Sequence, residues 1–101
     1  MSSQSHKLYI LVNRELSVPQ RAVQACHAAI EFSLKYGAQW KHESIVLLGV
    51  NQDEIDEWYF NFMTKHKEMK SMPFFEPHWD DKLTAIAVHG CDDLVKDLML
   101  L

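Results

Sequence analysis

The chain is short of glycine and cysteine, and each scarcity excludes a class of protein. Only 3 glycines occur in 101 residues, so no glycine-rich loop that cradles phosphates is present. The 2 cysteines, Cys26 and Cys91, lie far apart, which indicates neither a disulfide framework nor a paired zinc motif. No apolar run approaches the ~20 residues that cross a membrane, and the polar N-terminus MSSQSHK does not resemble a signal peptide. These absences favour a reduced, cytoplasmic protein with no membrane partner.

Positive charge is also in short supply. The sequence holds 10 lysines and arginines against 14 aspartates and glutamates, a formal net charge of −4. Proteins that hold nucleic acid by charge alone are usually basic, because Lys and Arg displace the counterions of the phosphates. A role with nucleic acid would therefore need a local basic patch. The hydrophobic content of 48% is normal for a globular core.

Hydrophobic periodicity predicts four strands and three helices in one domain, residues 1–101. The strands are expected at Leu8–Val12, Ile45–Val50, Met72–Phe75 and Leu83–Val88, and the helices over Ser17–Tyr36, from Asn51 through the periodic run Ile55–His66, and over Cys91–Leu101. Ala38–Glu43 is expected to be a polar link. The order β-α-β-α-β-β-α predicts an α/β fold, a small mixed four-stranded sheet with helices on both faces. Helix-linked strands should run parallel, and the last two strands should be antiparallel.

The ends of the helices carry recognisable capping residues. Ser17 and Gln20 form an S-x-x-Q capping box, and Gly37 is expected to stop the first helix. Asn51 and Glu54 repeat the capping logic at the start of the second helix.

A polar stripe crosses the first helix. Gln20, Gln24, His27 and Glu31 are spaced i, i+4, i+7 and i+11, so they share one face. Gln20 and Glu31 fit the polar edge of a helix that is otherwise buried. Gln24 lies among small apolar residues, and the sequence leaves its role open between scaffold and site. A partly buried histidine such as His27 is more often hydrogen-bonded scaffold than catalyst.

Two segments fall where open α/β sheets bind ligands, beside the carboxyl ends of strands. They are Asn13–Gln24 and the loop Glu76–Lys82. Glu76 is a candidate for orienting a water or a ribose hydroxyl, with a solvated loop carboxylate as the alternative. Trp79 could stack on a base or pack over the sheet edge.

Metal and nucleophile motifs are weak. His89-Gly90-Cys91 gives an H-x-C spacing without a second pair, so no metal and no cofactor is expected. Cys26 and His27 are neighbours on a helix and point about 100° apart, which excludes a hydrogen-bonded dyad. A metal-dependent hydrolase using His78 with Asp80 or Asp81 stays open as a third possibility.

The stretch LYILVNRELSVPQRAVQACHAAIEF resembles the first strand and helix of the peptidyl-tRNA hydrolase 2 family. The family pattern is a hydrophobic strand, an Arg-x-Asp/Glu-Leu loop and a helix that reads A-x-Q-x-x-H-A. Here the loop reads Arg14-Glu15-Leu16, without the intervening residue, and the helix pattern is Ala22–Ala28. SIVLLGVNQDEIDEW, FFEP and LTAIAV resemble the later elements of the family in the same order, so the likeness covers most of the chain.

The resemblance implies hydrolysis of the ester that joins a peptide to tRNA. By position, the family's lysine falls on Gln20, its aspartate on Glu76 and a threonine of its last strand on Thr84, which makes these three the expected catalytic residues. The expected substrate-binding residues are Arg14, Arg21, Gln24, His27, His78 and Lys82. The family's active loop is shortened here to EPHWDDK, and a preceding threonine is replaced by Lys82.

Two functions follow from these positions. The first is a divergent peptidyl-tRNA hydrolase that cleaves peptidyl- or aminoacyl-tRNA, with tRNA as partner. The second is a catalytically inactive binding module on the same fold, which the acidic balance and Gln20 at the lysine position favour. A homodimer is expected, since the family tends to form one and MPFF and Trp79 leave apolar surface.

Overall fold

The computed structural model describes residues 7–37 and 44–101, and the predicted polar link Ala38–Glu43 lies outside the described residues. The elements in chain order are β1 (Lys7–Asn13), α1 (Val18–Tyr36), β2 (Ser44–Val50), α2 (Gln52–Thr64), β3 (Ser71–Glu76), the 3₁₀ turn η2 (Pro77–Trp79), β4 (Lys82–His89), α3 (Asp92–Val95) and β5 (Met99–Leu100). The domain is a mixed α/β fold with the predicted element order up to α3.

The described strands form one five-stranded sheet in the order β3-β4-β1-β2-β5. β1 and β2 pair in parallel, while β4 is antiparallel to both β1 and β3. β1, β2 and β3 therefore run in the same direction and end at the same edge of the sheet, where β4 begins. The antiparallel pairing of the last two predicted strands is confirmed.

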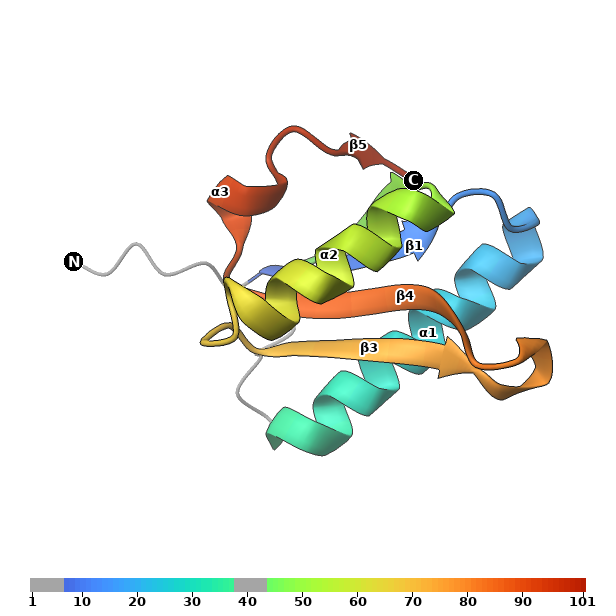
Figure 1. The fold of residues 1–101 in the computed structure, drawn as a ribbon, viewed down its shortest axis with the longest axis horizontal. Coiled ribbons are helices and arrows are strands. Elements are labelled where there is room, and N and C mark those ends of the chain that lie inside the picture. The colour runs from blue at the N-terminus through green and yellow to red at the C-terminus, as the bar shows by residue number, and fades with distance from the viewer. Residues whose placement is uncertain (1–6, 38–43) are drawn as a thin grey trace.

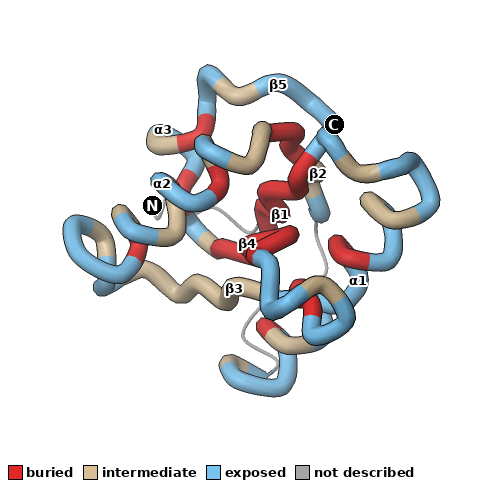
Figure 2. The backbone as a smooth tube through the Cα atoms, turned by 45° about the vertical axis from the view of Figure 1, so that its right-hand side comes forward, coloured by how far each residue is buried: buried red, intermediate tan, exposed pale blue. Residues whose placement is uncertain are grey.

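α1 and α2 cover opposite faces of the sheet (Figure 1). Alternate residues of β1 divide between two cores, since successive side chains in a strand point to opposite faces. Leu8, Ile10 and Val12 pack with α1, and Tyr9 and Leu11 pack with α2. The central strands are the buried part of the molecule (Figure 2). The predicted helices on both faces are confirmed.

The caps define where the helices begin and end. Asn51 and Glu54 form a two-sided capping box, in which each side chain accepts the other residue's backbone N–H at 2.8 Å. Ser17 accepts the N–H of Gln20 at 3.4 Å, but the Gln20 side chain is hydrogen-bonded elsewhere, to Gln24. The box predicted at Ser17 is therefore only half formed. α1 ends where predicted, with Gly37 at φ 68, a conformation that favours glycine.

The predicted final helix over Cys91–Leu101 is wrong in the second half of that segment, which forms a strand. The predicted sheet of four strands is therefore one strand short. The helix α3 ends at Val95, and Met99 and Leu100 pair with Gly49 and Leu48 of β2. β2 would otherwise present unpaired backbone groups at the edge of the sheet. Pairing at that edge outweighs the helix propensity of a leucine-rich segment, which is a weak determinant in tertiary context.

Candidate functional site

The first half of α1 and the tip of the β3–β4 hairpin lie at the same end of the molecule (Figure 1). β3 ends at Glu76, the turn η2 follows at once, and β4 restarts at Lys82. Gln24 is a fully buried polar residue of α1. The structure brings Gln24 of the first helix to Glu76, at the start of the predicted loop, where the two side chains are hydrogen-bonded.

A β-bulge aims Thr84 at α1. In the β3–β4 ladder Phe74 opposes Ala85 while Phe75 opposes Leu83, so Thr84 is an extra residue without a register partner. Strict alternation would send Thr84 to the face opposite Ala85, where α2 packs. Ala85 packs on the α1 side, and the Thr84 hydroxyl lies 2.7 Å from the Gln24 side chain of α1. Bulges commonly re-aim a side chain in this way beside functional sites.

Three buried polar side chains form one hydrogen-bonded cluster. The Gln24 Nε2 donates to Glu76 Oε1 at 2.9 Å, and the Thr84 hydroxyl donates to Gln24 Oε1 at 2.7 Å. Gln24 and Thr84 are 0% exposed, and Glu76 is 7% exposed. Gln20 extends the cluster toward the surface, because its Oε1 accepts the second Nε2 hydrogen of Gln24 at 3.4 Å. We call Gln20, Gln24, Glu76 and Thr84 the amide–carboxylate cluster.

The chemistry of the partners fixes the orientation of the Gln24 amide. An ionised carboxylate only accepts hydrogen bonds, so the NH₂ group must face Glu76. The carbonyl oxygen then faces Thr84, whose single hydroxyl hydrogen it accepts. The Phe74 carbonyl lies farther from that hydroxyl, at 3.4 Å. All three side chains thus satisfy one another, as buried polar groups must.

Hydrogen bonding holds the pKa of the Glu76 carboxyl below its usual range. The largest cause is the bond from Gln24, followed by the bond from the backbone N–H of His78 to Oε2 at 3.2 Å. Burial opposes the shift, while the electrostatic effects of the nearby His78 and His27 support it. Glu76 is therefore ionised at neutral pH, a weak proton acceptor but a competent acceptor of a hydrogen bond from water.

His27 is not the partly buried scaffold residue expected from the sequence. It is exposed, and its ring stacks on Phe74 of β3 with centroids 4.5 Å apart and planes within 4°. The histidine thus covers the strand that carries Glu76 instead of anchoring the helix by a buried hydrogen bond.

The loop after Glu76 is tight and charged. His78, Asp80, Asp81 and Lys82 are exposed, and Lys82 is the register partner of Glu76 across the hairpin. Asp80 and Asp81 both have positive φ, 52 and 57, which aspartate tolerates better than most residues. The chain thereby turns within a few residues and returns Thr84 to the cluster.

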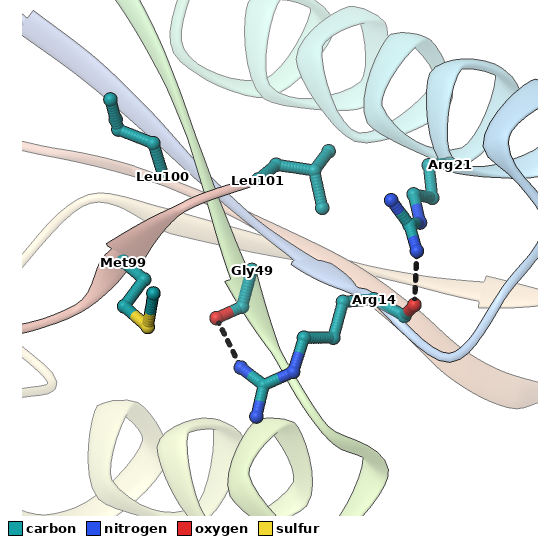
Figure 3. A pocket seen from close by; sticks show the side chains of 6 residues that line it. All are labelled: Arg14, Arg21, Gly49, Met99, Leu100 and Leu101. Atoms are coloured by element: carbon teal, nitrogen blue, oxygen red, sulfur yellow. Dashed lines mark hydrogen bonds between the residues drawn. The ribbon is translucent and has the colours of Figure 1, made fainter.

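Arg14 and Arg21, the two arginines predicted to bind substrate, line a different pocket (Figure 3). Arg21 donates from Nε to the Leu16 carbonyl at 3.0 Å and from Nη2 to the Arg14 carbonyl at 2.6 Å. Arg14 donates from Nη1 to the Gly49 carbonyl at 3.1 Å. The geometry therefore separates these guanidinium groups from the bonded network of Glu76.

A second polar pair, the buried Asn13 and the half-buried Gln52, lies at the same sheet edge and was not predicted from the sequence. Asn13 is 0% exposed, donates to Gln52 Oε1 at 2.7 Å and accepts the Glu15 N–H at 2.9 Å. Gln52 in turn donates to the Leu83 carbonyl at 3.1 Å, which links α2 to the residue before Thr84. The available signal was the position of Asn13, a polar residue directly after a buried apolar run.

Metal ligands do not gather in the described part of the chain, where no three His, Cys, Asp or Glu residues are grouped to hold an ion. Among the same residues, no helix is long and apolar enough to cross a membrane.

Comparison with known proteins supports the fold. A solved structure of a protein of unknown function, Atu0240 from Agrobacterium tumefaciens strain C58, is similar with a TM-score of 0.74 and 11% identity. The similarity covers 94% of this chain and 96% of that one. No protein-family model matches the chain, and no curated protein matches it. At this identity the likeness concerns the fold alone.

Removing the Thr84 hydroxyl should destabilise the protein. Thr84→Val leaves the Gln24 carbonyl oxygen buried without a donor, so the free energy of unfolding should fall by about 1–3 kcal/mol. Thr64→Val is the matched control, because Thr64 is exposed and donates only to the Phe60 carbonyl of its own helix. Urea unfolding followed by circular dichroism measures both, and equal losses would contradict the cluster.

Stability should depend on pH through Glu76. Because its folded-state pKa is lowered, its contribution is complete above the unfolded-chain pKa of about 4.3 and is lost as pH falls through the folded value. Glu76→Gln should therefore lose less stability between neutral and acidic pH than wild type. Urea midpoints across that range give the comparison, and parallel pH profiles would show that Glu76 contributes nothing.

Proposed function

We propose that this chain is a divergent peptidyl-tRNA hydrolase 2-like protein that hydrolyses the ester bond of peptidyl- or aminoacyl-tRNA. The supporting observation is the amide–carboxylate cluster, whose members come from α1, the end of β3 and the bulge of β4. Glu76 and Thr84 are 52 and 60 residues from Gln24 in sequence. A carboxylate that served only to be solvated would remain exposed, whereas Glu76 is buried in this cluster.

Glu76 is the group that holds the attacking water. Its carboxylate is ionised, keeps 7% exposure and is fixed in position by Gln24 and the His78 N–H. A lowered pKa makes it a weak base, so its main effect is to orient the water by accepting a hydrogen bond. Gln24 and Thr84 are fully buried and act through Glu76 as positioning residues.

Gln20 supplies a neutral donor where the resemblance predicts a lysine. Its Oε1 accepts from Gln24, which leaves its NH₂ group without an acceptor among the described residues. An amide N–H aimed at the ester carbonyl would stabilise the oxyanion that develops during attack. Gln20 is partly exposed, so a bound ester can reach it.

The reaction is an ordinary ester hydrolysis. The water oxygen attacks the ester carbonyl carbon, and the bond from that carbon to the ribose oxygen breaks. The peptide leaves as a carboxylic acid that ionises, and the ribose hydroxyl takes up a proton from the water. Lys82 and His78, exposed beside Glu76, are placed to meet phosphate, while the ring of His27 borders the site over Phe74.

Under this proposal the protein acts in the cytoplasm, where its substrate is made, and forms a homodimer. The apolar surface for such a pair includes Phe75, 37% exposed on β3.

A binding module without catalysis is the second candidate. It is favoured by the net charge of −4 and by the two further acidic side chains, Asp80 and Asp81, exposed beside Glu76. Both oppose the approach of a polyanion.

The catalytic proposal predicts release of peptide from peptidyl-tRNA that depends on Glu76. Glu76→Ala should lower the rate by about 10²-fold or more, and Gln20→Ala by about 10²-fold if it serves the oxyanion. Asp80→Asn is the matched control, an exposed carboxylate in the same loop, and should retain the rate. Wild-type activity no higher than Glu76→Ala at high protein concentration would refute catalysis.

The salt dependence of the affinity for tRNA is a second test that distinguishes the two candidates. If phosphates are held by Lys82 and neighbouring cations, affinity should fall steeply with salt, with a log–log slope of roughly −0.7 to −0.9 per contact. Lys82→Gln should reduce the magnitude of that slope by about the amount of one phosphate contact. Lys67→Gln is the control, because Lys67 is exposed and follows the end of α2, so this variant should leave the slope unchanged. Absence of binding at low salt would refute the hydrolase and would leave the binding module with a partner other than tRNA.

A further inference from the structure

β1 and β2 are parallel neighbours, so their carboxyl ends lie together at one edge of the sheet. The chain leaves β1 for α1 on one face of the sheet and leaves β2 for α2 on the other (Figure 1). Adjacent strands whose connections depart to opposite faces define a topological switch point, where open α/β sheets bind ligands.

A pocket occupies this place in the fold. Its volume is about 330 Å³, and it is lined by Arg14, Arg21, Gly49, Met99, Leu100 and Leu101 (Figure 3). That volume falls in the range of roughly 300–1,000 Å³ typical of small-molecule sites. Two arginines and the apolar side chains of Met99 and Leu101 lie around it (Figure 3), which is the mixture that such sites use for orientation and affinity.

The guanidinium groups are held in place yet keep free donors. Each carries five N–H bonds, and Arg21 uses Nε and one hydrogen of Nη2 on loop carbonyls. Arg14 uses one hydrogen of Nη1 on Gly49 and lies 3.8 Å from Glu54 through Nη2. The remaining N–H groups have no acceptor among the described residues. Arg14 and Arg21 bring two positive charges to the pocket, in a chain that is acidic overall.

Gly49 leaves space in the pocket because it has no side chain. A Cβ at this position would lie 3.3 Å from Leu101 Cδ1 and 3.5 Å from Arg14 Cβ. Any larger residue would therefore push the apolar wall and the cation apart or fill the space between them. The apolar wall is otherwise open to solvent, since Met99 and Leu100 are each 74% exposed.

We propose that this pocket binds a small organic anion made of one carboxylate and a short apolar chain. The carboxylate accepts hydrogen bonds from the free donors of Arg14 and Arg21, whose planar forks match its geometry. The chain lies against Met99 and Leu101 and removes their surface from water. A bare phosphate would satisfy the arginines but leave this wall exposed. The inference does not depend on the hydrolase proposal, because it uses no member of the amide–carboxylate cluster.

Calorimetric titration with hexanoate tests the proposal. We expect saturable 1:1 binding with Kd on the order of 1 mM or tighter. Hexan-1-ol, which lacks the charge, and inorganic phosphate, which lacks the chain, should each bind about tenfold or more weakly. Binding of phosphate alone would assign the pocket to simple anions, and binding of hexanol as tight as hexanoate would leave the arginines without a role. Either result would overturn the proposal.

Substitutions and chemical-shift mapping locate the binding. Arg14→Met should weaken hexanoate about tenfold or more, whereas Lys67→Met, an exposed cation elsewhere, should not. Gly49→Ala should weaken it by narrowing the pocket. If these variants fold poorly, amide shifts of the wild-type protein decide, because hexanoate should perturb Gly49, Arg14 and Leu101. Perturbations confined to other residues, or an unchanged affinity in folded Arg14→Met, would refute the site.

Discussion

The buried amide of Gln24 is the interaction on which the candidate site depends. It joins α1 to both strands of the β3–β4 hairpin, with one hydrogen bond to Glu76 and one from Thr84. A polar side chain at 0% exposure is tolerated only when its bonds are satisfied. Meeting that condition fixes three things together: the position of the carboxylate, its ionised state and the bulge that turns Thr84 toward the helix.

The sheet edge explains why polar chemistry collects at one end of the molecule. β1, β2 and β3 end there and β4 begins there, so side chains distant in sequence become neighbours. On the α1 side of the hairpin lies the amide–carboxylate cluster, and on the α2 side Asn13 and Gln52 bridge to the backbone beside it. The arginine pocket uses the same edge between β1 and β2. Cluster and pocket therefore share one scaffold while using separate groups.

Much of the fold could be predicted from the sequence, because buried strands and amphipathic helices leave strong local patterns. The end of α1 at Gly37 and the capping box at Asn51 and Glu54 are examples. The strand β5 could not be predicted, since its two residues are held by pairing with β2 and not by their own pattern. The bulge at Thr84 is a property of two strands together, and the stacking of His27 on Phe74 joins residues 47 positions apart (74 − 27). The candidate residues were identifiable one by one, but their bonds were not.

The most direct test is a ¹³C NMR titration of the Glu76 side-chain carboxyl in wild type and in Gln24→Met. If Gln24 fixes the carboxylate, the wild-type pKa lies below the usual value for glutamate, as the hydrogen bonds require. Loss of the amide should then raise the pKa of Glu76, because burial disfavours the charge once its donor is gone. An identical pKa in the two folded proteins would contradict the account.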